Sequence, residues 1–105
     1  MQYTEKGTEN NSKEQIIIVF EEDRNRSAAY CNGEQVGACE IGISENVWTI
    51  THTGVRSEYG GRGIAKKLVL CVIEAARAKK AKLVPLCSYA DKLMTGKEEF
   101  RDVLY

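Results

Sequence analysis

Hydrophobic positions in the first half of the chain fall into four short runs with strand character. These runs are QIIIVF (15–20), SAAYC (27–31), EQVGACEIGI (34–43) and VWTITHTGV (47–55). They are rich in β-branched residues or alternate between apolar and polar positions, which is typical of strands. Asn32-Gly33 separates the second run from the third, and Asn-Gly is a strong hairpin signal because both positions tolerate positive φ. The pattern predicts an antiparallel four-stranded meander.

The second half changes to a helical period. Apolar residues recur along one side at positions 64, 65, 68, 69, 72, 73, 75 and 76, which predicts a helix of about 17 residues that packs on a sheet. The run KLVPLC (82–87) predicts a fifth strand, in which Pro85 marks an edge position or a bulge. The last residues predict a short helix with Ser88 as N-cap, ending near Gly96.

The element order is therefore ββββαβα, an α+β fold in one domain over residues 14–105. A right-handed crossover through the long helix is expected to place the strands 47–55 and 82–87 parallel. A chain of 105 residues supports one hydrophobic core and not two. Residues 1–13 are polar and are expected to form a frayed tail.

Charge and targeting signals narrow the class of protein. Fifteen basic and fifteen acidic residues cancel, so nothing attracts the chain over long range to nucleic acid or to an anionic membrane. No apolar run approaches the roughly 20 residues of a membrane span. The first fifteen residues lack the apolar core of a signal peptide. We therefore expect a cytoplasmic protein with neither nucleic acid nor membrane as partner.

The four cysteines do not form a metal motif. Cys31, Cys39, Cys71 and Cys87 contain no CxxC pair, and His52 is the single histidine, so we expect no metal site. A disulfide between Cys31 and Cys39 is possible across the predicted hairpin, but a reducing cytosol argues against it. We interpret all four as thiols, most of them buried as small hydrophobes.

The segment EYGGRGIAKKL (58–68) places three glycines within four positions at a helix start. One interpretation is a tight turn that needs positive φ. The other is an anion site, because unpaired N–H groups and the helix dipole attract phosphate and glycine lets it approach closely. Arg62, Lys66 and Lys67 add positive charge, which favours the anion site. Neither a P-loop nor a dinucleotide fingerprint is present.

These segments resemble a known family. WTITHTGV, YGGRGIAKKL and the helix after them resemble the acetyl-coenzyme A (acetyl-CoA) binding motif of the GCN5-related N-acetyltransferases. With PLCSYADKLM, the resemblance extends to the small single-domain subgroup and covers residues 15–105. The superfamily motif Q/R-x-x-G-x-G/A matches at Gly63 and Ala65 and departs at Gly60, where one donor side chain is missing. The resemblance implies a minimal fold of this family.

The resemblance also implies a cosubstrate, acetyl-CoA, and a place for it. Its pyrophosphate is expected on the glycine loop and helix start, and its pantetheine arm beside the strand 47–55. The implied binding residues are Thr53, Gly54, Val55, Gly60, Gly61, Arg62, Gly63, Ile64, Ala65 and Lys66. An acceptor amine would then attack the acetyl carbonyl, while the protein orients both partners and moves protons.

Three side chains are candidates for that chemistry. Cys87 ends a strand and precedes a helix, where the dipole lowers a thiol pKa. It could protonate the leaving thiolate, carry the acetyl group, or be a buried structural thiol. His52 shares a face with Trp48 and Ile50 by alternation, and is either a general base or a hydrogen-bonded core residue. Tyr89 is either an acid for the leaving group or a packing aromatic.

The sequence leaves two main hypotheses open. The first is an N-acetyltransferase that acts on a protein lysine, a peptide or a small amine. The second is a coenzyme A-binding module with little turnover, which the glycine at position 60 favours. The family's larger members carry two helices between the first two strands, and EEDRNR (21–26) leaves no room for them. The acceptor groove is thus expected to be open and shallow. A small interaction protein that binds no coenzyme A is the third hypothesis.

Overall fold

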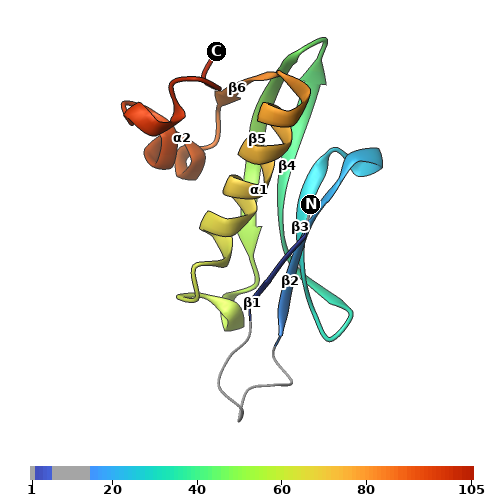
Figure 1. Cartoon of the computed structure of the whole chain (residues 1–105). Helices are drawn as coiled ribbons and strands as arrows, with labels where there is room; N and C mark the ends of the chain where they lie inside the picture. The colour runs from blue at the N-terminus through green and yellow to red at the C-terminus, as the bar shows by residue number, and fades with distance from the viewer. Residues whose placement is uncertain (1, 6–14) are drawn as a thin grey trace.

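One mixed sheet dominates the fold, as the computed structural model shows for residues 2–5 and 15–105 (Figure 1). Its strand order follows the sequence, β1-β2-β3-β4-β5-β6. The strands are β1 (Gln2–Glu5), β2 (Ile16–Glu21), β3 (Arg26–Cys31), β4 (Glu34–Ser44), β5 (Val47–Val55) and β6 (Lys82–Pro85). Neighbours are antiparallel from β1 to β5, and β6 runs parallel to β5. The α+β class and the parallel fifth strand predicted from the sequence are confirmed.

The long helix covers one face of this sheet (Figure 1). The helical elements are α1 (Ile64–Lys79), α2 (Ser88–Met94) and the 3₁₀ turns η2 (Glu22–Arg24), η3 (Ser57–Tyr59) and η4 (Glu98–Phe100). Leu68, Val72 and Ile73 of α1 are fully buried in one cluster with Ile18 and Ile50 of the sheet. The stripe of apolar residues read from the sequence is therefore the face that α1 turns to the sheet.

Several local predictions hold in detail. Asn32 and Gly33 form the hairpin turn with φ of 53° and 81°, as a two-residue turn with two positive φ angles requires. The helix predicted from position 64 begins at Ile64 and has 16 residues. Pro85 lies in β6, which is the edge strand of the sheet, where its missing N–H breaks no ladder.

The ends of the chain depart from the predictions. Gln2–Glu5 forms an edge strand on β2 where a frayed tail was expected, and residue 1 and residues 6–13 of that predicted tail lie outside the described part of the chain. Strand β6 ends at Pro85 rather than at position 87. The N-cap of α2 is Cys87 and not Ser88, because the Cys87 sulfur accepts the N–H of Ala90 at 3.4 Å.

Two β-bulges interrupt the alternation of faces, one in β4 and one in β5. Between the pairs Ala29↔Gly37 and Tyr30↔Gln35, residue 36 of β4 is extra. Between Glu40↔His52 and Ile41↔Ile50, residue 51 of β5 is extra. Because an extra residue shifts the period of two, side chains after a bulge change face relative to a regular strand. The second bulge decides where the candidate catalytic residues point.

Gly37 lies where β4, β5 and α1 meet. A Cβ there would lie 3.0 Å from the carbonyl oxygen of Gly54 and 3.2 Å from Cδ1 of Leu68. We predict that Gly37→Ala lowers the free energy of unfolding by about 1–3 kcal/mol, because an overpacked core must shift. Urea unfolding followed by the fluorescence of the buried Trp48 measures this.

Gly42→Ala is the matched control, because nothing lies within 4 Å of a Cβ at that position. We expect it to change the unfolding free energy by less than about 0.5 kcal/mol, as surface substitutions do. Equal losses for Gly37→Ala and Gly42→Ala would contradict the packing described at Gly37.

Candidate functional site

The parallel strands β5 and β6 separate halfway along β5. Their pairing ends at Ile50, whose carbonyl oxygen accepts two N–H groups, from Leu86 at 3.1 Å and from Cys87 at 3.0 Å. The chain then turns away into α2. In the part of the chain that the structure describes, no strand pairs with the β6 side of 51–55. This half of β5 therefore offers a free backbone edge beside the start of α2.

A thiol lies at the point of separation. The Sγ of Cys87, which is half-buried, lies 3.5 Å from Oγ1 of Thr53 on β5. The same hydroxyl donates to Sγ of the fully buried Cys39 on β4, also at 3.5 Å. Burial raises the pKa of the Cys39 thiol to about 11, because a low dielectric disfavours the thiolate. One hydroxyl thus contacts a buried thiol and an accessible one.

The glycine loop leads into α1, and the first backbone N–H groups of this helix have no acceptor within it. Gly61 and Gly63 both have φ of 76°, a left-handed conformation that favours glycine. Gly63 is the N-cap of α1 and, within the described residues, no side chain caps the helix and no acidic residue occupies its first turn. The first helical bond is that of the Lys67 N–H to the Gly63 carbonyl, at 3.2 Å. The earlier N–H groups have no acceptor inside the helix, so this end is electropositive.

Gly60 differs from the other two glycines. Its φ is −66°, and its N–H donates to the carbonyl of Ser57 at 3.0 Å. That N–H is already paired, so Gly60 brings no spare backbone donor to the predicted loop. Its contribution is the absence of a side chain at the mouth of the loop.

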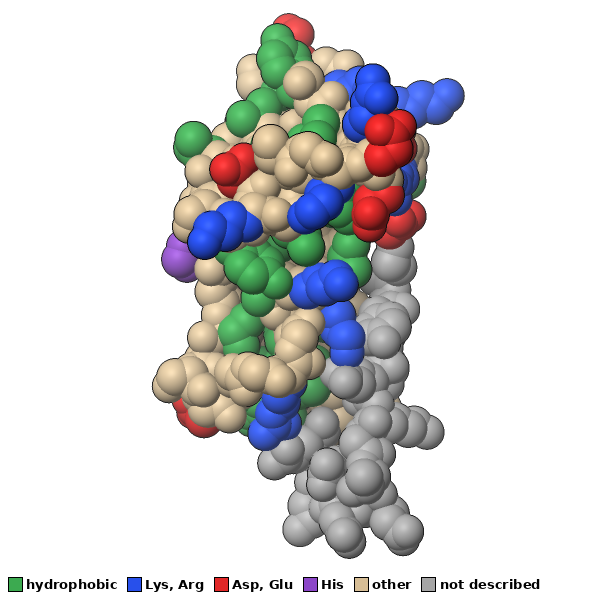
Figure 2. All heavy atoms as spheres, turned by 90° about the vertical axis from the view of Figure 1, so that its left-hand side faces the viewer, with side chains coloured by type: hydrophobic (Ala, Val, Ile, Leu, Met, Phe, Trp, Pro, Cys, Tyr) green, Lys and Arg blue, Asp and Glu red, His purple; other side chains and the backbone are tan. Residues whose placement is uncertain are grey.

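Positive and apolar side chains surround a groove beside the loop. The Arg62 guanidinium lies 5.0 Å from the centre of the Tyr59 ring, and Lys66 is exposed. Between α1 and α2 runs a groove of about 430 Å³, in which three cationic side chains outnumber one carboxylate; it is lined by Lys66, Leu70, Arg77, Leu93, Lys97, Glu99 and Phe100. Figure 2 shows Lys and Arg side chains around apolar ones on this side of the molecule. An anionic ligand with an apolar part would be complementary to this surface.

His52 points away from the Cys87 thiol. Alternation predicted a face shared with Trp48 and Ile50, and this prediction is wrong because residue 51 forms a bulge. Trp48 and Ile50 are buried, whereas His52 is exposed and pairs with the exposed Glu40. The bulge also turns Thr53 inward, toward the two thiols. Imidazole and thiol consequently lie on opposite faces of the sheet.

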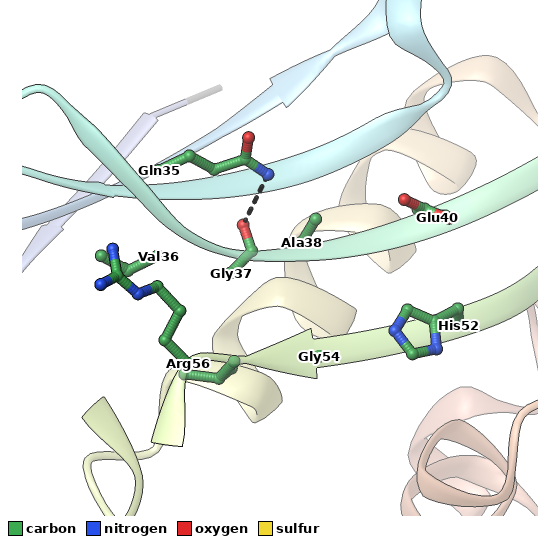
Figure 3. A pocket seen from close by; sticks show the side chains of 9 residues that line it. Gln35, Val36, Gly37, Ala38, Glu40, His52, Gly54 and Arg56 are labelled. Atoms are coloured by element: carbon green, nitrogen blue, oxygen red, sulfur yellow. Dashed lines mark hydrogen bonds between the residues drawn. The ribbon is translucent and has the colours of Figure 1, made fainter. Parts of the chain in front are cut away.

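On its own face, His52 borders a shallow pocket of about 380 Å³, whose lining includes Gln35, Ala38, Glu40, Gly54 and Arg56 (Figure 3). A Cβ on Gly54 would lie 3.0 Å from Nε2 of His52, so the imidazole lies over the bare backbone of Gly54. Arg56 is held by Glu34 at 2.9 Å and Glu58 at 2.8 Å. The carboxylate of Glu40 makes this pocket complementary to a cation, such as a protonated amine.

Tyr89 lies two residues after Cys87 in α2. Its side chain is 40% exposed, so it is not a core aromatic. Partial burial raises the pKa of its phenol, which keeps the hydroxyl protonated at neutral pH. Leu86, which precedes the thiol, is 67% exposed. The short segment after β6 thus carries an apolar side chain, a thiol and a phenol: Leu86, Cys87 and Tyr89.

Comparison with known proteins identifies the class. A family model described as GCN5-related N-acetyl-transferase matches residues 26–103, and the chain belongs to this family. The fold is similar to the solution structure of a GCN5-like protein from Staphylococcus aureus, with a TM-score of 0.66, 27% identity and 90% of each chain covered. No curated protein matches the sequence.

A second solved structure supports the fold alone. It is N-acetylglutamate synthase from Neisseria gonorrhoeae in complex with coenzyme A and N-acetyl-glutamate. The TM-score is 0.52 and the identity 17%, and the match covers 63% of this chain and 18% of that one. The resemblance stated from the sequence is therefore confirmed at the level of family and fold.

Two further features bear on the class of site. Within residues 2–5 and 15–105, no three His, Cys, Asp or Glu side chains gather as metal ligands would. No helix in the same residues is long and apolar enough to cross a membrane. All four cysteines are free thiols, three of them buried.

The sequence reasoning missed the contact between Cys39, Thr53 and Cys87. Thr53 was expected to contribute its backbone only, and Cys39 was interpreted as a buried hydrophobe. Pairing across β4 and β5 brings Cys39 opposite Thr53, and this register depends on the bulge. The THT segment (51–53) contains no glycine or proline that would have marked it.

The four thiols should differ sharply in reactivity. Cys31, Cys39 and Cys71 are at most 6% exposed, and burial raises the pKa values of Cys39 and Cys71. We predict that iodoacetamide at pH 8 modifies Cys87 alone in the folded protein, because reaction needs an accessible thiolate. Peptide mass spectrometry reads the modified site. All four should react in 8 M urea, and modification of Cys39 before Cys87 in the native protein would contradict this arrangement.

Proposed function

We propose that the protein is an N-acetyltransferase that transfers the acetyl group of acetyl-CoA to an amine. One juxtaposition carries the proposal. An uncapped helix start after a glycine loop lies at the end of β5, and the free edge of that strand leads back to the Cys87 thiol. Such a path suits a long substrate with an anionic end and a reactive thioester end. Membership of the N-acetyltransferase family supports it.

The residues of the loop fit the anionic end of acetyl-CoA. The N–H groups of Gly61–Lys66, which precede the first helical bond, would bind the pyrophosphate together with the helix dipole. Arg62 and Lys66 would add charge around it. A Cβ at Gly61 or Gly63 would meet nothing within 4 Å, so the space in front of these two glycines is open. Gly60 would contribute only the absence of a side chain, which leaves room for the pyrophosphate.

The pantetheine arm would pair with the free edge of β5 at Thr53, Gly54 and Val55. These residues have β4 on one side and no strand on the other in the described chain, so an extended amide chain can add to the edge as a strand would. Its thioester would then reach the region of Cys87. The arm would run in this direction because the glycine loop would hold its anionic end and Cys87 lies at the other end of the free edge.

The chemistry then needs one proton removed and one supplied. The acceptor nitrogen attacks the acetyl carbonyl, the new C–N bond forms, the C–S bond breaks, and the leaving thiolate takes up a proton. We assign the supply of that proton to Cys87 or Tyr89. His52, in its pocket with Glu40 (Figure 3), would accept the proton of the amine. Thiol and imidazole on opposite faces fit a reaction in which the two substrates approach from opposite sides.

The acceptor is proposed to be a protein lysine, a peptide or a small amine. Only the 3₁₀ turn η2 stands between β2 and β3, so the sheet face that carries His52 has no helical cover from that connection. The pocket on this face is shallow and has one exposed carboxylate, Glu40, at its wall. A side chain or chain end that projects a single ammonium group would suit it better than a ligand that must be enclosed.

A coenzyme A-binding module with little turnover is the second candidate. Two observations favour it. First, Gly60 lacks the Gln or Arg side chain of the family motif, and its own N–H donates to the carbonyl of Ser57. Second, the sheet face proposed for the acceptor is open. The two candidates share the cofactor site and differ in whether the Cys87 and His52 side chains are needed for transfer.

The anion site can be tested with one added charge. We predict that Ala65→Asp, in the first turn of α1, weakens acetyl-CoA binding by at least about tenfold, because a carboxylate takes the position at the dipole that the pyrophosphate needs. Isothermal titration calorimetry with acetyl-CoA measures the affinity.

Ser44→Asp adds the same charge at an exposed position at the far end of β4 and is the matched control. We expect its affinity to equal that of the unchanged protein. Equal weakening by both substitutions would mean that the glycine loop is not the anion site. No binding of acetyl-CoA by the unchanged protein at millimolar concentration would reject both the enzyme and the module.

Turnover can be tested separately from binding. We predict that Cys87→Ala and His52→Gln each keep the acetyl-CoA affinity within about threefold and lower kcat by about 10²–10⁴, the usual range for a lost acid or base. Release of coenzyme A in the presence of a panel of peptide and small amines gives the rate. Transfer that is undetectable in the unchanged protein and in both variants, with binding intact, would favour the module instead.

A further inference from the structure

The contact between Cys39, Thr53 and Cys87 has a geometry that the proposed reaction has not used. Oγ1 of Thr53 lies 3.5 Å from each sulfur, and Cys87 also accepts the N–H of Ala90 at 3.4 Å. Cys39 is completely buried, whereas Cys87 is half-buried. The hydroxyl therefore stands between a thiol that solvent cannot reach and one that it can.

The hydrogen bonds of this group form a directed chain when both cysteines are protonated. Thr53 has one hydroxyl hydrogen, and it donates to Cys39. Its oxygen is then free to accept the S–H of Cys87, since a hydroxyl is one donor and two acceptors. The chain runs from the Ala90 N–H through Cys87 and Thr53 to Cys39, which accepts its last hydrogen bond.

The same atoms can serve a thiolate at Cys87 if the chain reverses. Burial raises the pKa of Cys39 to about 11, so its thiol keeps a proton to donate throughout the neutral range. The hydroxyl can then rotate, accept from Cys39 and donate to the charged sulfur. Only two hydrogens change direction, and the heavy atoms keep their positions.

We propose that Thr53 is a positioning residue for Cys87: its hydroxyl, supported by the Cys39 thiol, donates to the Cys87 sulfur whenever that sulfur is a thiolate. The side chain of Thr53 thereby acts apart from its backbone, which lies on the free edge of β5. The assignment deepens the proposed acetyl transfer, in which Cys87 gives up a proton or carries the acetyl group. The hydrogen-bond chain itself can be tested without any cosubstrate.

Other groups near Cys87 stay constant when Thr53 changes. The titratable groups on the surrounding elements are Tyr89 and Asp91 on α2 and Cys39 on β4. Cys71 of α1 and Glu40 of β4 act on Cys39, and His52 of β5 points to the opposite face with Glu40. The Ala90 N–H and the start of α2 act on the sulfur in every Thr53 variant. A difference between two Thr53 variants therefore reports the hydroxyl.

The experiment compares Thr53→Val, which replaces the hydroxyl by a methyl group, with Thr53→Ser, which keeps the hydroxyl. The rate of Cys87 modification by iodoacetamide is measured from pH 6 to pH 10 in the protein without ligand, with Cys87→Ala as the blank. We expect Thr53→Val to move the midpoint of the pH profile upward by about one unit and to slow modification at pH 7 about tenfold, because one pKa unit is a tenfold change in thiolate. Thr53→Ser should return to within a few tenths of a unit of the original midpoint.

Each result of this experiment either supports or overturns the proposed role of Thr53. An unchanged midpoint in Thr53→Val, or an equal shift in Thr53→Ser, overturns the proposal. Thr53→Ala serves as a second hydroxyl-free variant should Thr53→Val lose its circular dichroism spectrum. If both hydroxyl-free variants are unfolded while Thr53→Ser is folded, the hydroxyl is a structural requirement and the assigned role is overturned as well.

The outcome is also separable from that of the proposed function. The pH profile of Thr53→Val is measured without ligand, so it reports the hydroxyl whether or not the protein binds acetyl-CoA. A shifted profile in a protein that binds no acetyl-CoA would keep the role of Thr53 and reject the acetyltransferase. Normal acetyl transfer with an unshifted profile would keep the acetyltransferase and reject the role of Thr53.

Discussion

The carbonyl oxygen of Ile50 accepts two backbone N–H groups, from Leu86 and Cys87, and the rest of the site depends on this interaction. Pro85, which has no N–H, precedes these two donors and costs the ladder no bond. The next two donors converge on one acceptor, and the chain must turn off the sheet there. That turn frees the second half of β5, places Cys87 as N-cap of α2, and opens the space between strand and helix. A small sheet thus acquires a free backbone edge beside a thiol without an additional layer.

The glycine loop completes the site from the other end of β5. Because Gly63 adopts a left-handed conformation at the N-cap, α1 can begin directly after the turn with no side chain over its first N–H groups. The opposite end of α1 is fixed elsewhere: Arg77 pairs with Asp102 at 2.8 Å and with Glu74 at 2.9 Å. The helix is therefore held by its apolar face and its last turn, while the N–H groups of its first residues have no acceptor within the helix.

Sequence patterns predicted what is local and missed what depends on pairing. The positive φ angles at Asn32 and Gly33 follow from the residues themselves, and the apolar period located the start of α1 correctly. The bulge at residue 51 has no such signal, because it is set by the register with β4, and the predicted face of His52 was wrong for that reason. Strand β1 was missed likewise: Gln2–Glu5 carries little apolar pattern and pairs on the edge of β2. The glycine loop at the start of α1 was located from the sequence, and its role in binding acetyl-CoA stays a prediction.

One inserted residue in β5 divides the candidate chemistry between the two faces of the sheet. In a regular strand Thr53 would point with Thr51 and away from His52, on the face opposite the core. The bulge exchanges the two, so that Thr53 reaches both thiols on the covered face and His52 lies over Gly54 on the open one. A protein with only one helical layer has no second layer in which to build an acceptor site. Using both faces of the same strand would separate the group proposed to serve the thioester from the group proposed to serve the amine.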